Sequence, residues 1–264
     1  MLSPRDTTTQ LCKSSSISIS PTPEVLDSHV DFFGNKVHYF AIEQEHDKLT
    51  VTVNSVVEKL DVGTNGNIND ISWEEAKLLF QQPGAEWMKP KQFVAATAFT
   101  EPSPEIVAYA AVSFTPGRPM YDAVFDLMRR IHKDFEFKAG FTTVSTPLSQ
   151  VMKQKKGVCQ DFAHLMIGAV RSMGLAARYV SGYLRSGGDL QGADASHAWV
   201  SVFIPDTGWV SFDPTNDVIP SEGHLTLAWG RDYGDVTPLK GISLGGGGDE
   251  TIEVEVRVHP LAKR

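Results

Sequence analysis

The stretch from Gly157 to Gly174 constrains the fold of this 264-residue chain more than any other, because it has the pattern of one amphipathic helix with Cys159 in its first turn. Its apolar side chains fall on a single helical face: Phe162, Leu165, Met166, Ala169, Val170 and Met173. Gly174 follows in the position where helices commonly end in glycine. We therefore expect this helix at the centre of a compact domain.

Two strand-like segments follow the helix and surround a polar turn. Residues 197–204 and 209–213 have strand character, and the sequence Pro205-Asp206-Thr207-Gly208 separates them. Near the end of the chain, apolar and charged residues alternate over 252–258, which is typical of a half-buried strand. These segments predict a sheet beside the central helix.

The region before the helix divides into two parts of different character. Residues 16–59 are turn-rich with short alternating patterns, and the sequence DFFGN at 31–35 predicts a turn between strands. Further on, Ser72 and Glu75 form the signature of a capping box that opens a helix. The predicted organisation is a β-rich N-terminal region at 1–62, a helical connector at 63–118 and a compact core at 119–264.

The composition argues against several partners and locations. The chain carries 24 Lys and Arg against 32 Asp and Glu, a net charge of -8, without the basic excess that binding to nucleic acid requires. No run of about 18 apolar residues occurs, and the first residues lack the apolar stretch of a signal peptide. Cys12 and Cys159 stand far apart in different contexts, which argues against a disulfide framework. The sequence predicts a cytoplasmic protein that binds neither nucleic acid nor a membrane.

Cys159, His197 and Asp213 form the candidate catalytic set. At the first turn of a helix, unpaired backbone N–H groups and the helix dipole favour a thiolate over a thiol. His197 opens one strand-like segment and Asp213 ends the next, so a base and a carboxylate to orient it follow the nucleophile. The backbone N–H of Cys159 is one candidate oxyanion donor, and the sequence identifies no second donor. This chemistry requires no metal or organic cofactor.

The spacing of the hairpin conflicts with this assignment. If Pro205–Gly208 is a four-residue loop, His197 faces Asn216, and Asp213 lies on the opposite face of the sheet. A bulge, an offset between the strands or a different pairing is needed to bring the two side chains together.

Each residue of the set also has a structural interpretation. Cys159 alone could be a buried structural thiol, His197 a satisfied strand histidine, and Asp213 a turn residue before Pro214. Trp199 is either a core residue or part of a substrate groove. The set is more informative than its members, because all three residue types occur together in a consistent order.

A zinc site is the metal alternative. It would use Cys159, His164, His197 and Asp213, but His164 lies five residues after Cys159, so the two do not share a helical face. We therefore expect no metal site. The remaining histidines have no nucleophile nearby in the sequence and are expected at surface or structural positions: His29, His38, His46, His132, His224 and His259.

Three longer stretches resemble the bacterial transglutaminase-like cysteine protease family: KKGVCQDFAHLMIGAVRSMGLAARYVSGYL, DASHAWVSVFIPDTGWVSFDPTND and HLTLAWGRDYGDVTPLKG. The resemblance covers about residues 119 to 259. It implies an α+β fold with a papain-like, transglutaminase-like core, in which the helix that carries the cysteine packs on an antiparallel sheet. It also implies that Cys159, His197 and Asp213 are the catalytic residues.

The β-rich start of the chain is similar to the N-terminal region of the same family. Relatives usually carry a further strand or more upstream of the sequence LSPRD, so we expect this unit to be truncated or built on a shorter sheet.

The resemblance implies amide-bond chemistry through a thioester intermediate. We expect hydrolysis of a peptide or isopeptide bond in a peptide or protein substrate, with transfer of the acyl group to an amine as the alternative within enzymes. The alternative from another class is a peptide-binding module without catalysis. Such a module would lack a member of the catalytic set, and none is missing here. The sequence indicates no oligomeric state.

Overall fold

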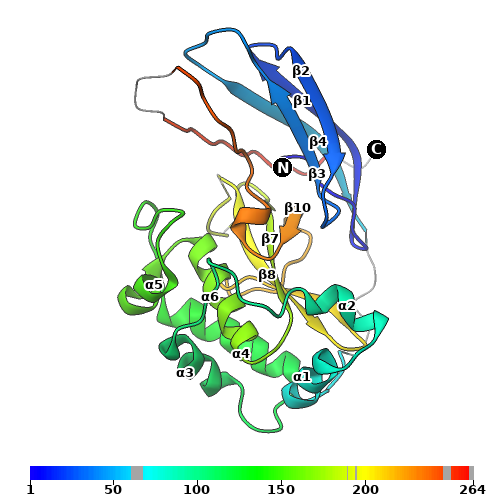
Figure 1. Ribbon diagram of the computed structural model, residues 1–264, viewed down its shortest axis with the longest axis vertical. Coiled ribbons are helices and arrows are strands. Elements are labelled where there is room, and N and C mark those ends of the chain that lie inside the picture. Colours follow the sequence, from blue (N-terminus) through cyan, green and yellow to red (C-terminus); the bar gives the residue numbers. More distant parts are fainter. Residues whose placement is uncertain (61–67, 189, 194, 246–250, 262–264) are drawn as a thin grey trace.

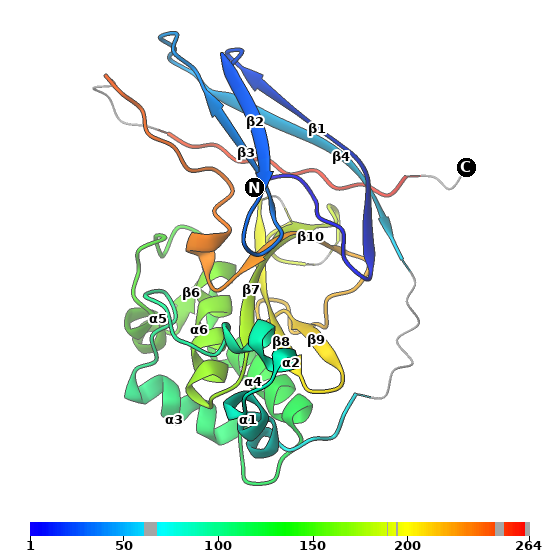
Figure 2. The ribbon, with the colours of Figure 1, turned by 45° about the vertical axis from the view of Figure 1, so that its right-hand side comes forward.

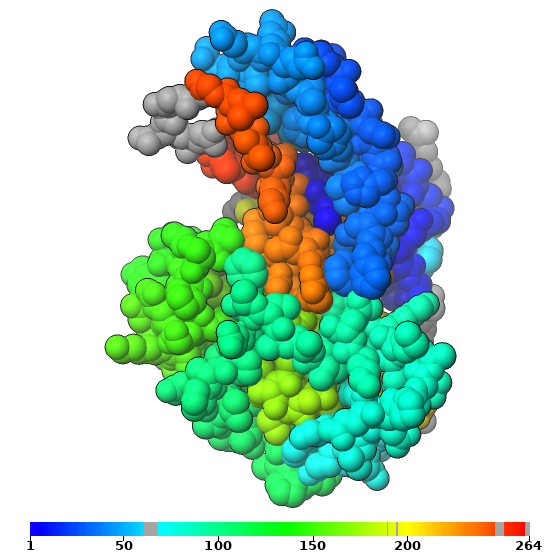
Figure 3. All heavy atoms as spheres, in the orientation of Figure 1, coloured from blue at the N-terminus to red at the C-terminus, as the bar shows by residue number. Residues whose placement is uncertain are grey.

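The computed structural model describes residues 1–60, 68–188, 190–193, 195–245 and 251–261. A β-rich N-terminal unit, blue in Figure 1, lies above an antiparallel sheet that packs against a layer of helices. Figure 3 shows the same division in the space-filling view, with the N-terminal strands above and the helical part, green and cyan, below. The sheet and its helices position the candidate site.

The N-terminal unit consists of two separate pairs of antiparallel strands. Its strands are β1 (Gln10–Ser20), β2 (Val25–Val30), β3 (Lys36–Ala41) and β4 (Thr50–Lys59). β1 pairs with β4, and β2 pairs with β3. The predicted turn at 31–35 joins β2 to β3, and Gly34 in this turn has a φ of 78°, which glycine adopts without strain.

The structure describes six α-helices, and the predicted capping box opens the first of them. They are α1 (Trp73–Gln81), α2 (Ala85–Lys91), α3 (Pro104–Ser113), α4 (Met120–Asp134), α5 (Leu148–Gln154) and α6 (Cys159–Ser172). Ser72 Oγ accepts from the backbone N–H of Glu75, and the Glu75 carboxylate accepts from the backbone N–H of Ser72. Within the described residues, no helix has the length and apolar character needed to cross a bilayer.

The central sheet has four antiparallel strands in the order β10-β7-β8-β9. They are β7 (Ala177–Leu184), β8 (His197–Ile204), β9 (Gly208–Phe212) and β10 (His224–Gly230). A short 3-10 helix, η1 (Tyr233–Asp235), follows β10. The parallel pair of β5 (Glu136–Phe137) and β6 (Lys156–Gly157) leads directly into α6.

The helix α6 lies between the sheet and the other helices. It packs on β7 and β8 and contacts α3, α4 and α5. The helix is therefore buried on all sides and not only along the single stripe that the sequence predicts. Even its glycine is in tight contact, since a Cβ at Gly168 would lie 3.0 Å from the carbonyl oxygen of Thr100. The cysteine-bearing helix on an antiparallel sheet confirms the predicted α+β fold class.

Two side-chain amides attach the N-terminal unit to the outer edge of β10, and Figure 2 shows the N-terminal strands next to this strand. The amide of Gln10 donates to the carbonyl of Thr226 (2.8 Å) and accepts from its N–H (2.9 Å). The amide of Asn35 makes the same two bonds with Trp229, at 2.8 and 3.0 Å. Both amides are buried and provide the hydrogen bonds that a neighbouring strand would otherwise make with this edge.

The alternating segment at 252–258 is not a strand, so this prediction is wrong. Ile252 is 79% exposed and Val254 is 60% exposed, and the backbone of the segment bonds to Ser186 at Val258. An alternating pattern forms a strand only where a sheet edge can accept it. The outer edge of β10 is already occupied by the amides from the N-terminal unit.

Candidate active site

Cys159 is the first residue of α6, and Val158 joins it to the end of β6. The buried carboxylate of Asp161 closes this end of the helix, because it accepts from the backbone N–H of Val158 (2.8 Å) and from the Thr142 hydroxyl. Gly157 leaves room for that carboxylate, since a Cβ there would lie 2.7 Å from Asp161 Oδ2. The N–H groups of a first helical turn have no intrahelical acceptor. The backbone N–H of Cys159 is therefore available to a substrate oxygen, and the side chain is partly exposed.

His197, the first residue of β8, is bonded to Asp213. His197 Nε2 donates to Asp213 Oδ2 over 2.8 Å, and both side chains are fully buried. Hydrogen bonds between charged groups are the strong ones, particularly where water is excluded. The imidazole is thus held in one orientation by a carboxylate that solvent does not reach.

The register of the β8–β9 hairpin resolves the conflict found in the sequence. Ile204 pairs with Gly208, so the loop contains three residues, 205–207, and not four. The pairing therefore moves by one residue, and Asp213 falls opposite Trp199 when the ladder is continued. Trp199 and His197 lie two residues apart on one strand and share a face. The offset places Asp213 on the same face as His197.

The pKa of His197 reflects Cys159 as well as Asp213. Burial alone would lower the pKa of His197, but its interactions with Asp213 and Cys159 outweigh burial and raise the pKa to about 10. Nε2 is bonded to Asp213, so Nδ1 is the ring nitrogen that remains for the thiol. Nδ1 is buried and has no hydrogen-bond partner among the described residues. The backbone of Gly192 packs over it, since a Cβ there would lie 2.8 Å from Nδ1.

Asp213 is held by donors on both of its oxygens. Oδ1 accepts from the backbone N–H groups of Thr215 (2.9 Å) and Asn216 (3.3 Å), and Oδ2 accepts from the side-chain amide of Asn216 (2.8 Å). Burial alone would raise the pKa of Asp213, but the hydrogen bonds from His197, His224 and Asn216 hold it well below its usual range. The carboxylate is therefore ionised at neutral pH and fixed in position.

His224, the first residue of β10, also reaches Asp213. We expected it at a surface or structural position, but it is 3% exposed and its Nε2 donates to Asp213 Oδ2 over 3.1 Å. The sequence gives one signal for it, because His224 opens the third stretch of the family resemblance. The contact itself depends on the pairing of β10 with β7, which is not local in sequence.

Trp199 belongs to the core and not to a groove. It is 2% exposed and packs against both histidines, with its ring centre 6.1 Å from that of His197 and 5.2 Å from that of His224. Gly182 on β7 makes space for it, since a Cβ there would lie 2.3 Å from the indole. The indole thus packs against both imidazoles.

The zinc set considered from the sequence is not assembled. His164 Nε2 accepts from the backbone N–H of Tyr233 (3.1 Å), and burial above all lowers the pKa of His164 to about 3. The described residues whose ligand atoms come within 4.8 Å of one another are His197, Asp213 and His224. The Asp213 oxygen in this group already accepts from both imidazoles, so these residues satisfy one another as hydrogen-bond partners.

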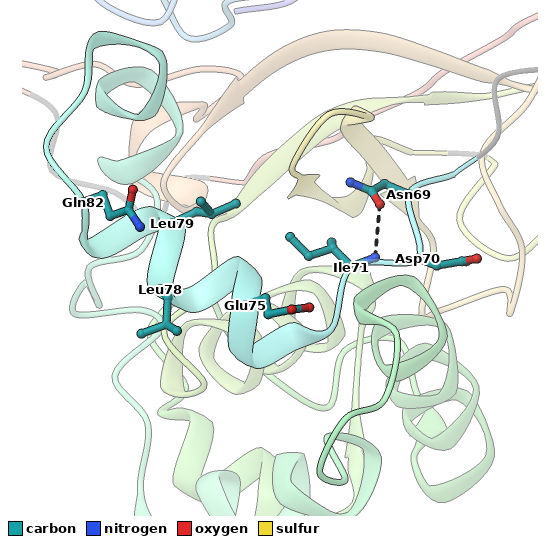
Figure 4. A pocket seen from close by; sticks show the side chains of 7 residues that line it. All are labelled: Asn69, Asp70, Ile71, Glu75, Leu78, Leu79 and Gln82. Carbon is teal, nitrogen blue, oxygen red and sulfur yellow. Dashed lines mark hydrogen bonds between the residues drawn. The ribbon is translucent and has the colours of Figure 1, made fainter.

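The structure also contains an open pocket of about 580 Å³ that is separate from this set (Figure 4). It is lined by residues of α1 and of the segment before it: Asn69, Asp70, Ile71, Glu75, Leu78, Leu79 and Gln82. Asn69 Oδ1 accepts from the backbone N–H of Ile71 (3.2 Å), so the polar group at its edge supports the chain turn before the helix. None of its lining residues belongs to the candidate catalytic set.

Comparison with known proteins agrees with this fold and gives its family. The family model described as Transglutaminase-like superfamily matches residues 108–214, and the Bacterial transglutaminase-like N-terminal region matches residues 1–58. An uncharacterised protein of Mycobacterium tuberculosis is 36% identical over 98% of this chain and 85% of its own length. This chain therefore belongs to the transglutaminase-like superfamily.

Two further similarities are more limited in identity or in length. A structure from Cytophaga hutchinsonii, described as a candidate cysteine protease, has a TM-score of 0.69 and 22% identity, and the match covers 89% of this chain and 76% of that one. A protein-glutamine gamma-glutamyltransferase of Pseudomonas aeruginosa is 38% identical over 74 residues, which are 25% of this chain and 11% of that protein. The first similarity supports the same fold.

Proposed function

We propose that this protein is a cysteine-dependent enzyme that cleaves an amide bond in a peptide or protein substrate through a thioester. Cys159 is the nucleophile, His197 is the general base and acid, and Asp213 orients His197. The observation that supports this proposal is one buried imidazole that is bonded to a buried carboxylate and whose raised pKa reflects a thiol at a helix N-terminus.

The first half of the reaction uses the ion pair of Cys159 and His197. The thiolate attacks the carbonyl carbon, a C–S bond forms, and the carbonyl electron pair moves to the oxygen, where the N–H of Cys159 donates to it. The C–N bond then breaks, and the leaving nitrogen takes the proton from His197 Nδ1. The amine departs, and the acyl group remains on sulfur as a thioester.

The second half regenerates the enzyme. His197 Nδ1, now neutral, accepts a proton from water while the water oxygen attacks the thioester carbon. The C–S bond breaks, and the sulfur leaves as a thiolate beside the imidazolium. Throughout both halves, Asp213 holds the tautomer with a proton on Nε2 and stabilises the positive charge.

Transfer of the acyl group to a primary amine is the alternative second half. The similarity of a 74-residue segment to a protein-glutamine gamma-glutamyltransferase favours considering it. The chemistry differs only in which nucleophile His197 deprotonates. A cytoplasmic location remains part of the proposal.

Alkylation of Cys159 by iodoacetamide across pH tests the ion pair. We expect rapid modification well below pH 8 and slower modification at the same pH in His197→Gln, because the imidazolium stabilises the thiolate. Mass spectrometry of the digested protein measures the rate at each cysteine, and Cys12 serves as the internal control thiol. Equal rates at Cys159 and Cys12 would support a binding module instead of an enzyme.

Profiling on a mixed peptide library, with and without a primary amine, tests the reaction. Hydrolysis predicts cleaved or deamidated products without the amine, and acyl transfer predicts ammonia release with the amine incorporated. Cys159→Ala is expected to keep its fold and lose activity by at least roughly a thousandfold. Retained turnover in that variant would reject the mechanism.

A further inference from the structure

We propose that His224 is a positioning residue of this site: it holds the Asp213 carboxylate in the orientation that directs His197 toward Cys159. This inference rests on the proposed function of the three residues and adds a fourth, from a strand that is not a neighbour of β8 in the sheet.

The first argument is the geometry at one oxygen atom. Asp213 Oδ2 accepts from three donors: His197 Nε2 at 2.8 Å, Asn216 Nδ2 at 2.8 Å and His224 Nε2 at 3.1 Å. The three donors come from β8, from the turn after β9 and from β10. Together they fix both the position and the rotation of the carboxylate.

The second argument is the state of the His224 ring. Its Nε2 faces an ionised carboxylate, which can only accept, so this nitrogen carries the proton. Its Nδ1 is buried and has no hydrogen-bond partner among the described residues. Among the described residues, the bond to Asp213 is therefore the hydrogen bond that holds this imidazole in place.

The third argument is the packing that places the two imidazoles on one carboxylate. Gly182 of β7 pairs with His197 on one side and with Thr226 of β10 on the other. The space above this glycine is filled by Trp199, which meets the His224 ring edge-on at 89° and the His197 ring at 29°. The sheet thus orients both histidines through a common neighbour.

The loss of the His224 donor has a definite expected effect on the site. A buried carboxylate that loses one of its donors gains an unsatisfied acceptor site and the freedom to rotate. The hydrogen bond between Asp213 and His197 then has a less favourable geometry, so the imidazolium stabilises the Cys159 thiolate less. Alkylation of Cys159 by iodoacetamide should therefore be slower at a given pH.

The experiment compares two amides that differ by one methylene group. His224→Gln places an N–H donor near the original Nε2, whereas the shorter side chain of His224→Asn does not reach Asp213. We expect His224→Asn to slow alkylation of Cys159 at pH 6 about tenfold and His224→Gln to stay within about threefold of the parent protein. If His224→Asn does not fold, His224→Phe, which fills the space without a donor, takes its place.

A second readout separates this proposal from the proposed function. In the NMR spectrum of protein labelled with ¹⁵N-histidine, the Nε2–H of His197 bonded to Asp213 should exchange with water about tenfold faster in His224→Asn than in His224→Gln. This measurement needs no enzymatic activity. His164→Phe, which replaces a buried histidine outside the site, is the control and should change neither exchange nor alkylation.

The outcomes are distinct. An ordinary thiol profile of Cys159 in the parent protein rejects the proposed function, while the exchange of the His197 proton still reports on His224. Equal behaviour of His224→Asn and His224→Gln in exchange and in alkylation overturns the positioning role.

Discussion

His197 sets the pH response of the site at the scale of single residues. Its pKa in the folded protein is raised to about 10, against roughly 6.5 in an unfolded chain. A raised pKa means that the folded state binds the proton more tightly, so the contribution to stability is fully present below about pH 6.5 and is lost as the pH rises through 10. Asp213 has the opposite sign, because its pKa is depressed: its contribution is lost as the pH falls below about 4.

We expect the free energy of unfolding to fall by an amount on the order of 3 kcal/mol between pH 6.5 and 10, and to fall less in His197→Gln. Urea unfolding at the two pH values measures both proteins. The difference between them isolates His197 from the other groups that titrate in this interval. Equal losses in the two proteins would contradict the ion pair.

The close approach of Gly192 to the imidazole gives a second prediction for a single residue. In Gly192→Ala, the new Cβ would lie 2.8 Å from His197 Nδ1, and the φ of 91° adds backbone strain. We expect slower alkylation of Cys159 and a loss of roughly 1 to 3 kcal/mol in stability. Gly187→Ala is the matched control, because Gly187 has a φ of 76° with nothing within 4 Å of the added Cβ. Only strain should appear there, with alkylation unchanged.

At the scale of elements, β10 connects the N-terminal unit to the site. Its outer edge binds the amides of Gln10 and Asn35, and its first residue, His224, binds Asp213. A side-chain amide has one donor and one acceptor in the geometry of a peptide group, so each can replace one residue of a missing strand. The N-terminal unit therefore stabilises the strand that carries His224.

Asn35→Ala should lower the free energy of unfolding by roughly 2 to 4 kcal/mol, because it leaves the backbone N–H and C=O of Trp229 without a partner. Gln10→Ala should lower it by roughly 1 to 3 kcal/mol, because it leaves the N–H of Thr226 without a partner while the Thr226 carbonyl still accepts from the N–H of Arg5. Chemical denaturation measures the change. Asn54→Ala, at an exposed position of β4, is the control and should stay within about 0.5 kcal/mol. A small effect at Gln10 and Asn35 as well would mean that water satisfies this edge.

The helices and strands also show which parts of the fold can be predicted from the sequence. The capping box at Ser72, the helix with Cys159 in its first turn and the two strands on either side of the polar turn follow from local patterns. The structure confirms these elements, with the helix beginning at Cys159 and Asp213 one residue beyond the end of β9. The prediction of a strand at 252–258 is wrong because the alternating pattern indicates which face a strand would bury, but not whether the edge of a sheet is free to pair with it. Local patterns also could not fix the loop length at 205–207, on which the face of Asp213 depends.

At the scale of the whole molecule, the parts that the sequence could not reveal are those made by distant contacts. His224 contacts Asp213 only because β10 pairs with β7. The buried helix α6 contacts three other helices, which its single apolar face does not predict. Arg5 from the start of the chain stacks 3.2 Å from the Trp229 ring, with Arg178 at 3.8 Å on the same residue. The contact of Arg5 with Trp229 joins residues 224 positions apart, and the contact of Arg178 with Trp229 joins residues 51 positions apart.

The length of the turn at 205–207 has a consequence for insertions and deletions in members of this family. Side chains alternate between the faces of a strand, so the parity of this loop decides which way Asp213 points. One inserted or deleted residue that shifts the β8–β9 pairing by one position would turn the carboxylate away from His197, although every residue of the site would still be present in an alignment. Under the proposed function, we expect a homologue whose pairing is shifted by an odd number of residues at this turn to be inactive, unless a bulge elsewhere in the hairpin restores the original pairing.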